Sequence, residues 1–227
     1  MRFEEVDQHL EGVKFMSSEQ GRTVYDFLVS NQLSRVLELG FAHGKSSCYY
    51  AAAVDELDGH LTTIDRPGAR KREPNIDQLL DKCGLTHRVT PIYADGSFTW
   101  ELMKLLDQTP QPRFDFAYLD AGHTWDVTGF GFFLVDKLLA PGGWMLFDDL
   151  KWTIETSEGL KGTAQAKKVS EEQRTTAQVG KVFDLLVRTH PDYVNVKQKG
   201  NWGWAQKSPE AAEAQAPKRG LLAALRR

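Results

Sequence analysis

The sequence predicts an α/β fold with a mainly parallel sheet covered by helices on both faces. Three observations predict it. Short apolar runs of strand length alternate with helical segments along most of the chain, a pattern typical of parallel sheets. The first of these runs leads through a glycine turn into an Ala-rich segment. Four later runs each end directly at an aspartate, which places acidic groups along one edge of the sheet.

Length and composition indicate one globular domain. The chain has 227 residues, of which 41% are hydrophobic, enough for a packed core. Its formal net charge of −3 argues against a nucleic-acid binder, which usually has a basic excess. It has no apolar run of about 20 residues that could span a membrane, and residues 1–7 do not resemble a signal peptide. Cys48 and Cys83 lack metal-ligand spacing, so we expect a cytoplasmic protein with reduced thiols.

The glycine turn follows a strand expected over residues 35–39. Gly40 and Gly44 frame the turn, and an Ala-rich helix is expected over 48–57. Such a unit can bind nucleotide-like ligands, because glycine lets the backbone approach and the N–H groups of a helix N-terminus face an anion. The spacing fits neither a phosphate loop nor a dinucleotide fingerprint. On its own, the turn is equally compatible with an ordinary strand-to-helix connection.

The remaining elements of the parallel region follow in chain order. Residues 1–17 have mixed character and are expected to wrap the domain, and a helix capped by Ser17 or Ser18 is expected up to Asn31. Further strands are expected over 60–65, 87–94, 114–119 and 144–147, and further helices over 74–83, 100–106 and 124–139, the last stopped by Pro141-Gly142-Gly143.

The C-terminal part has a different pattern. Residues 153–176 are polar and carry several glycines and lysines, and a loop of this length in a compact domain is usually a lid. A helix is expected over 179–188, followed by a hairpin with strands near 193–196 and 202–205. The Ala-, Pro- and charge-rich residues 207–227 are expected to form a disordered tail.

Asp65, Asp95, Asp120 and Asp148 each follow a predicted strand. The ligand crevice of an open α/β sheet lies at the carboxyl ends of its strands, so these side chains should lie near one another. An Asp at a strand end can also simply cap the next helix. However, four crowded carboxylates cost energy unless they are paired, which favours a ligand. Asp65 lies about 20 residues after Gly44, where nucleotide-binding folds place an acidic residue against ribose hydroxyls.

Two motifs resemble those of a known enzyme family. Glu38-x-Gly40-x-x-x-Gly44 resembles the first motif of class I S-adenosylmethionine-dependent methyltransferases. Residues 114–126 resemble a motif of the catechol and macrolide-sugar O-methyltransferases that has the family pattern Asp-Gly-x-His-x-Tyr. Residues 141–149 resemble the next strand of the same group. The resemblance covers residues 16–206. It implies a Rossmann-like, seven-stranded sheet with a C-terminal antiparallel hairpin, in a domain over residues 1–206 with an N-terminal cap and helix over 1–31 and a lid over 153–176.

The resemblance also implies S-adenosylmethionine as the cofactor. In the family, Gly40 lies against the cofactor with Glu38 near it, and Ser46 matches a position that holds the cofactor carboxylate. The expected cofactor residues are Glu38, Gly40, Gly44, Ser46, Asp65, Arg66, Asp95, Gly96, Ser97 and Asp120, with the adenine near Asp95, Gly96 and Ser97.

Metal-dependent members of the group bind Mg²⁺ at positions that correspond to Asp120, Asp148 and Asp149. Carboxylate oxygens suit Mg²⁺, Mn²⁺ or Ca²⁺. The sequence departs from the pattern here, because the catechol type has Asp-Asn in place of Asp148-Asp149, and Ala121-Gly122 replaces the commoner Gly and polar residue. The alternative is that Asp148 and Asp149 only cap the loop after the strand and point apart.

His123 is the leading candidate for the catalytic base. It lies three residues after Asp120, at the position of the catalytic Lys in the catechol type, and a neutral imidazole can accept a proton at physiological pH. The structural alternative is a His at a helix start that contacts backbone or water. Lys151 is the second candidate. His43, inside the glycine turn, is expected only to pack or to form hydrogen bonds.

We therefore expect an S-adenosylmethionine-dependent O-methyltransferase that acts on a small hydroxylated acceptor with the help of Mg²⁺ or a similar cation. Two alternatives remain. One is a metal-independent N- or carboxyl-methyltransferase, and the other is a non-catalytic nucleoside-binding protein. The acceptor pocket should be built from residues 1–17 and the lid over 153–176. No nucleic-acid or membrane partner is expected, and the sequence leaves homo-oligomerisation open.

Overall fold

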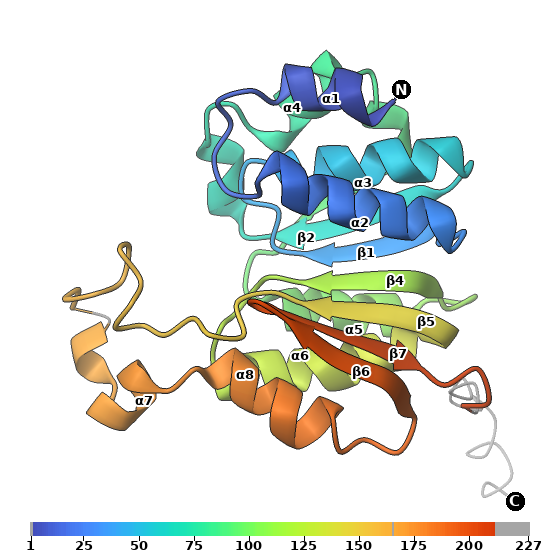
Figure 1. Cartoon of the computed structure of the whole chain (residues 1–227). Helices are drawn as coiled ribbons and strands as arrows, with labels where there is room; N and C mark the ends of the chain where they lie inside the picture. Colours follow the sequence, from blue (N-terminus) through green and yellow to red (C-terminus); the bar gives the residue numbers. More distant parts are fainter. Residues whose placement is uncertain (1, 165, 212–227) are drawn as a thin grey trace, which may run out of the picture.

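A single sheet of seven strands forms the centre of the molecule (Figure 1). The computed structural model describes residues 2–164 and 166–211. The strands are β1 (Arg35–Leu39), β2 (His60–Asp65), β3 (Val89–Tyr93), β4 (Phe114–Leu119), β5 (Leu139–Phe147), β6 (Tyr193–Lys199) and β7 (Trp202–Lys207). Their order is β3-β2-β1-β4-β5-β7-β6, with β1 to β5 parallel and β7 antiparallel to both β5 and β6. The predicted fold is confirmed.

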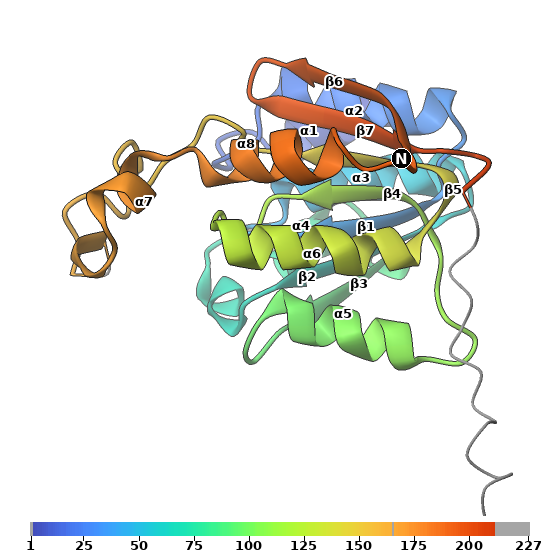
Figure 2. The ribbon, with the colours of Figure 1, turned by 90° about the horizontal axis from the view of Figure 1, so that it is seen from below.

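Helices cover both faces of the sheet (Figure 2). One face carries α1 (Phe3–His9), α2 (Ser18–Ser30), α3 (Lys45–Glu56) and α4 (Ile76–Lys82), and the other carries α5 (Phe98–Asp107), α6 (Trp125–Leu138) and α8 (Gln178–Val182), which continues as the π-helical turn η4 (Phe183–Val187). Each face has its own core, because side chains alternate along a strand: in β1, Val36 packs into the first core, and Leu37 and Leu39 pack into the second.

The order of the strands creates a switch point between β1 and β4. The chain moves from β1 to β2 and β3 on one side, and then returns to β4 and β5 on the other. The loops after β1 and β4 therefore diverge at the carboxyl edge of the sheet, where open α/β sheets bind their ligands.

Several element ends differ from the predictions. α3 begins at Lys45 rather than residue 48, because Gly44 adopts a left-handed φ of 95° as its N-cap. The predicted helix stop at Pro141-Gly142-Gly143 is wrong, because these residues continue β5, which shifts its register against β4. The helix expected over 74–83 spans only α4, which is capped by the Asn75 side chain, and short 3₁₀ helices occupy Pro67–Lys71 and Thr86–Arg88.

The two ends of the chain also contain structure that the sequence did not predict. The first residues form α1, in which Phe3 and Val6 are buried. Lys207, expected in the tail, is the last residue of β7 and is buried, and its Nζ donates to the carbonyl of Asp136 at 2.7 Å. Residues 212–227 of the predicted tail lie outside the described residues.

The predicted lid lies in an arm that projects from the carboxyl edge of the sheet (Figure 1, left). It contains turns, the 3₁₀ helix η3 (Ala166–Lys168) and α7 (Glu171–Thr175), rather than one unstructured loop. Within the arm, Glu155 forms ion pairs of 3.7 Å with both Lys161 and Arg174, and these pairs link segments that are distant in the sequence. Movement of this arm over the site stays a prediction.

Candidate active site

The glycine turn after β1 packs tightly against neighbouring elements. Gly40 has a φ of 91°, and a Cβ placed on it would lie 2.1 Å from the carbonyl oxygen of Asp120. A Cβ on Gly44 would lie 2.6 Å from Cγ1 of Ile76 in α4. Real Cβ atoms do not approach so closely, so each glycine is required by a left-handed conformation and by a contact within the protein. The turn is therefore fixed directly against the end of β4.

Asp65 orients this turn from the end of β2. Its Oδ2 accepts hydrogen bonds from the N–H groups of Phe41 (3.0 Å) and Ala42 (2.7 Å), and its Oδ1 accepts from the N–H of Arg66 (2.6 Å). A carboxylate offers about four lone-pair sites. One site therefore remains for a ligand hydroxyl, in the place where the sequence predicted a ribose contact.

Glu38 lies beneath the turn and is fully buried. Its carboxylate accepts hydrogen bonds from the hydroxyls of Ser46 (2.5 Å), Ser47 (2.5 Å) and Thr63 (2.6 Å). Burial raises the pKa of Glu38 to about 7, although the three hydroxyl bonds act in the opposite direction. This placement differs from the predicted cofactor contacts, because Glu38 has no exposed surface and the Ser46 hydroxyl is directed inward to it.

The expected adenine-binding residues lie in the loop between β3 and α5. Asp95 and Gly96 are exposed, and a Cβ on Gly96 would have no neighbour within 4 Å. Ser97 is the N-cap of α5, and its Oγ accepts a hydrogen bond from the N–H of Thr99 at 3.2 Å. The loop lies at the same sheet edge as Asp65, since the N–H of Ala94 donates to the Asp65 carbonyl at 2.7 Å.

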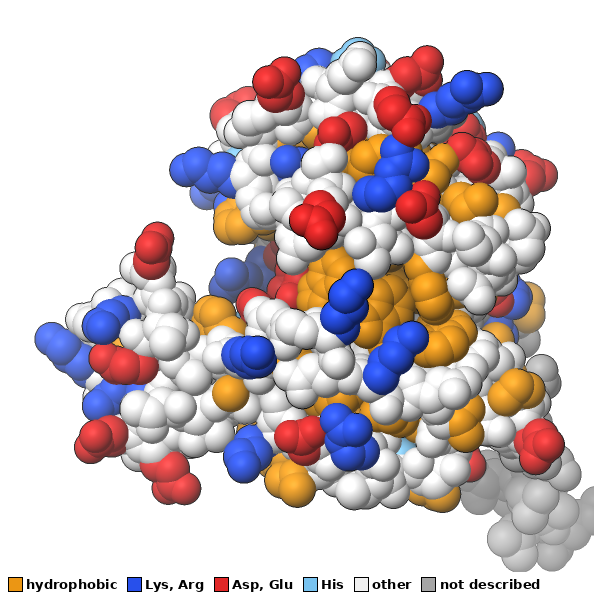
Figure 3. Space-filling model, in the orientation of Figure 1, with side chains coloured by type: hydrophobic (Ala, Val, Ile, Leu, Met, Phe, Trp, Pro, Cys, Tyr) orange, Lys and Arg blue, Asp and Glu red, His pale blue; other side chains and the backbone are white. Residues whose placement is uncertain are grey.

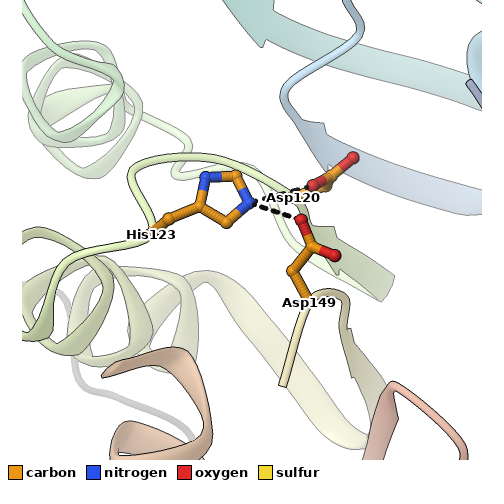
Figure 4. A group of neighbouring side chains, drawn as sticks. All are labelled: Asp120, His123 and Asp149. Atoms are coloured by element: carbon orange, nitrogen blue, oxygen red, sulfur yellow. Dashed lines mark ion pairs between the residues drawn. The ribbon is translucent and has the colours of Figure 1, made fainter. Parts of the chain in front are cut away.

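A histidine between two carboxylates forms the centre of the site (Figure 4). Nε2 of His123 lies 3.4 Å from Oδ1 of Asp120 at the end of β4, and 3.1 Å from Oδ2 of Asp149 after β5. His123 and Asp149 have left-handed φ angles of 50° and 58°, which residues other than glycine rarely adopt. The Trp152 ring lies beside the imidazole, with 4.9 Å between the ring centroids. Backbone strain of this kind gathers at functional sites.

The charges in this cluster perturb one another. Burial raises the pKa of Asp120 to about 7, and the neighbouring Asp148 carboxylate adds to this effect, while the nearby His123 imidazole opposes it. For His123, burial lowers the pKa, but the carboxylates of Asp120 and Asp149 outweigh burial and raise it to about 9. The two carboxylates therefore favour the protonated imidazole, which balances their charge.

Asp148, predicted as a metal ligand, has other partners. Its Oδ2 accepts a short hydrogen bond from the hydroxyl of the buried Tyr118, and its Oδ1 accepts from the N–H of Asp149 at 2.7 Å. Burial raises the pKa of Asp148. Instead of three carboxylates, the structure groups Asp120, His123 and Asp149, whose ligand atoms lie within 4.8 Å of one another. Asp148 does not belong to this group, because its two oxygens are bonded to Tyr118 and to the N–H of Asp149.

Two residues at the site were missed by sequence reasoning. Tyr118 lies inside β4 and was treated as part of an apolar strand, although its hydroxyl holds Asp148. Asn201, in the turn between β6 and β7, donates from Nδ2 to Oδ1 of Asp149 at 2.9 Å and accepts the N–H of Lys151 at 2.7 Å. The Lys151 side chain is exposed. Only the pairing of β7 with β5 brings Asn201 to the site, so a local motif could not have identified it.

A family profile for a methyltransferase domain matches residues 37–150, half of the chain. The chain belongs to the methyltransferase-domain family. A search of curated proteins found no matching sequence. The predicted class I S-adenosylmethionine-dependent methyltransferase is thereby confirmed at the level of family and fold.

Solved structures with the same fold are methyltransferases too. The methyltransferase is similar to the O-methyltransferase TomG of Streptomyces achromogenes in complex with S-adenosylmethionine, with 20% identity, 91% of this chain and 89% of that chain covered, and a TM-score of 0.64. It is similar to an O-methyltransferase of Bacillus cereus with bound S-adenosylhomocysteine (16% identity, 92% of each chain, TM-score 0.67).

A third similar structure is MycE of the mycinamycin pathway, solved with Mg, S-adenosylhomocysteine and mycinamycin VI (19% identity, 96% of this chain, 56% of that chain, TM-score 0.57). Among the described residues of the methyltransferase, no helix has both the length and the apolar character that a membrane span requires.

Proposed function

We propose that the methyltransferase transfers the methyl group of S-adenosylmethionine to a hydroxyl oxygen of a small acceptor, with a divalent cation at the Asp120–His123–Asp149 cluster. The cluster is the observation that carries the proposal. It lies at the carboxyl ends of β4 and β5, and Gly40 packs against the carbonyl of Asp120, which is itself part of the cluster. A cofactor held by the glycine turn would therefore lie next to the cluster.

The chemistry of the cluster fits a divalent cation. Asp120 and Asp149 supply carboxylate oxygens, the ligands that Mg²⁺ and Mn²⁺ prefer. Nε2 of His123 is buried and, among the described residues, lacks a hydrogen-bond partner of acceptable geometry, although both carboxylates are near. Two crowded carboxylates favour an added positive charge, and the nitrogen becomes an acceptor once it has lost its proton. Mg in MycE, which has the same fold, supports the proposal.

The residues then have separate tasks. Asp120 and Asp149 would hold the cation, which would lower the pKa of an acceptor hydroxyl bound to it. His123 would release its own proton to solvent once the cation balances the two carboxylates, and the neutral imidazole would then accept the hydroxyl proton. The hydroxyl oxygen would gain the methyl group as the carbon–sulfur bond breaks, with S-adenosylhomocysteine as the second product. Asp65 and the glycine turn would hold the cofactor beside the cluster.

The acceptor would enter between the body of the domain and the arm. Figure 3 shows the surface hollowed there, with acidic side chains in the hollow. Trp152, at the base of the arm, lies beside His123 with its ring tilted by 42°, and it can shield the reacting groups from water. The small size of the acceptor and its hydroxyl group remain part of the proposal.

A turnover assay tests the function. Purified protein is incubated with S-adenosylmethionine and a panel of small phenols, catechols and sugars, with Mg²⁺ or with EDTA, and methylated products are identified by mass spectrometry. We expect O-methylated product that disappears in EDTA. Equal turnover in EDTA would remove the cation from the proposal. N-methyl or ester products would support the metal-independent alternative, and cofactor binding without turnover on a broad panel would contradict catalysis.

A further inference from the structure

We propose that Asn201, in the turn of the C-terminal hairpin, is a positioning residue that orients the Asp149 carboxylate toward His123. The role of Asn201 in catalysis rests on the proposed function, whereas its contacts with the loop after β5 do not. Asn201 lies 52 positions after Asp149 in the chain, and its contact is produced by the antiparallel pairing of β7 with β5.

Asn201 makes three hydrogen bonds to consecutive residues of the loop after β5. Its Nδ2 donates to Oδ1 of Asp149 at 2.9 Å, its carbonyl accepts the N–H of Leu150 at 3.0 Å, and its Oδ1 accepts the N–H of Lys151 at 2.7 Å. One residue thus fixes both the path of the loop and the rotation of one carboxylate. Because the amide occupies Oδ1, the other oxygen of Asp149 is left to face Nε2 of His123 at 3.1 Å.

The loop needs such a restraint. Asp149 has a φ of 58°, and a residue other than glycine keeps a left-handed conformation only when its surroundings over-determine it. The opposite side of the loop is packed as well, because a Cβ on Gly180 would lie 2.4 Å from the carbonyl oxygen of Leu150. The hairpin is short at this point, since Gly200 and Asn201 form a two-residue turn that joins β6 directly to β7.

Asp148, the neighbour of Asp149 in the same loop, has a different partner. Its carboxylate is bonded to Tyr118 and does not belong to the cluster. Two neighbouring aspartates therefore have different orientations because they have different partners: Tyr118 in β4 for one, and Asn201 in the hairpin for the other. Partners of metal-binding carboxylates typically change metal affinity by about 10–100-fold when they are removed.

The test compares Asn201→Asp with Asn195→Asp. Asn201→Asp keeps the size of the side chain and an acceptor for Lys151, but it replaces the amide donor with a carboxylate facing Oδ1 of Asp149. Asn195 lies in the same hairpin, is exposed, and donates to Gln206 at 2.8 Å, so its substitution adds the same charge away from the site. Asn201→Ala, which removes the donor without adding charge, is the second variant.

Crystal structures of the variants and Mn²⁺ affinity measured by electron paramagnetic resonance give two independent readouts. We expect both Asn201 variants to turn the Asp149 carboxylate away from His123, and Asn201→Ala to bind Mn²⁺ about 10–100-fold more weakly, with unchanged affinity for S-adenosylmethionine and an unaffected Asn195→Asp control. If Asp149 keeps its orientation in Asn201→Ala, the inference is overturned. A parent protein that binds no Mn²⁺ contradicts the cation in the proposed function, while the crystal structures still decide the role of Asn201.

Discussion

His123 has two possible chemical uses, as a base or as a third ligand of the cation, and one substitution separates them. For a general base, His123→Ala should reduce kcat by roughly 10²–10⁴-fold. Cation affinity should stay the same or increase, because the variant lacks the imidazolium that competes for the carboxylates of Asp120 and Asp149. Turnover measured beside Mn²⁺ titrations of the same sample checks this. Weaker Mn²⁺ binding in the variant would instead identify His123 as a ligand.

Glu38 should make the stability of the protein depend on pH. Burial raises the pKa of Glu38 to about 7 from its ordinary value of 4.5, so the folded state binds the proton more tightly than the unfolded state does. The stabilisation is fully present below pH 4.5 and is lost as the pH rises through about 7. Within that window the free energy of unfolding should fall by up to about 1.4 kcal/mol per pH unit.

Urea unfolding at pH 5, 6, 7 and 8 measures this slope. Glu38→Gln should flatten it, because glutamine does not ionise, whereas the exposed control Glu11→Gln should leave it unchanged. The difference between the two variants isolates Glu38 from Asp120 and His123, which titrate in the same range. Parallel curves for parent and Glu38→Gln would show that Glu38 stays ionised in its three hydroxyl bonds.

Residue types at the site could be predicted from the sequence, but their partners could not. The positions of Asp65 and Asp120 follow from strand ends, because the carboxyl ends of parallel strands share one edge, whereas Asp149 was predicted from the family resemblance. Which way each carboxylate turns depends on a side chain from another element, such as Tyr118 or Asn201. The two-residue alternation of a strand and the preference of Asp for helix caps carry no information about such contacts.

At the scale of elements, the glycine turn is tightly constrained by its neighbours. Gly40→Ala should destabilise the protein in two ways: a left-handed alanine costs about 1–2 kcal/mol, and its Cβ would meet the Asp120 carbonyl at 2.1 Å. Overpacking of this kind adds about 1–3 kcal/mol. Because that carbonyl belongs to the backbone of the site, we also expect weaker binding of S-adenosylmethionine.

Gly12→Ala is the matched control for Gly40→Ala. Gly12 has a similar φ of 77°, but a Cβ there would have no neighbour within 4 Å. Gly12→Ala should therefore lower the free energy of unfolding by only about 1–2 kcal/mol, from backbone strain alone, with unchanged cofactor affinity. Chemical denaturation and calorimetry of both variants measure the two effects. Equal losses of stability would mean that the contact with Asp120 is relieved by a small movement of β4.

Helices and strands were predicted correctly where hydrophobic periodicity determines them. Their ends were predicted incorrectly where pairing with a distant strand determines them. The parallel strands and the hairpin lie where the apolar runs predicted them. β5 is longer than predicted, because pairing with β4 and β7 extends a strand through a Pro-Gly-Gly sequence that locally favours a turn. α1 has only seven residues and is stabilised by burial of Phe3 and Val6, which no local pattern of that length can show.

At the scale of the whole molecule, the binding of a cation should raise the stability of the folded protein. An ion that binds only the folded state stabilises it by mass action, by about 2.7 kcal/mol at 100 times its dissociation constant. For a protein of this size that corresponds to a rise in Tm of roughly 5–10 °C. We expect this rise with Mn²⁺ or Mg²⁺ in the parent protein and in Asp81→Asn, an exposed substitution in α4 that controls for lost charge.

Two substitutions then distinguish the possible ligand sets. Asp149→Asn should abolish the rise in Tm, since Oδ2 of Asp149 is one of the oxygens that face the cluster. Asp148→Asn should keep most of it, because the Asp148 carboxylate is engaged by Tyr118 and by the N–H of Asp149. Loss of the rise in both variants would mean that Asp148 leaves Tyr118 to join Asp120 and Asp149 around the ion. Anomalous scattering from crystals soaked in Mn²⁺ would then show a peak about 2.0–2.3 Å from all three carboxylates. The absence of any rise in the parent protein would instead favour methyl transfer without a metal.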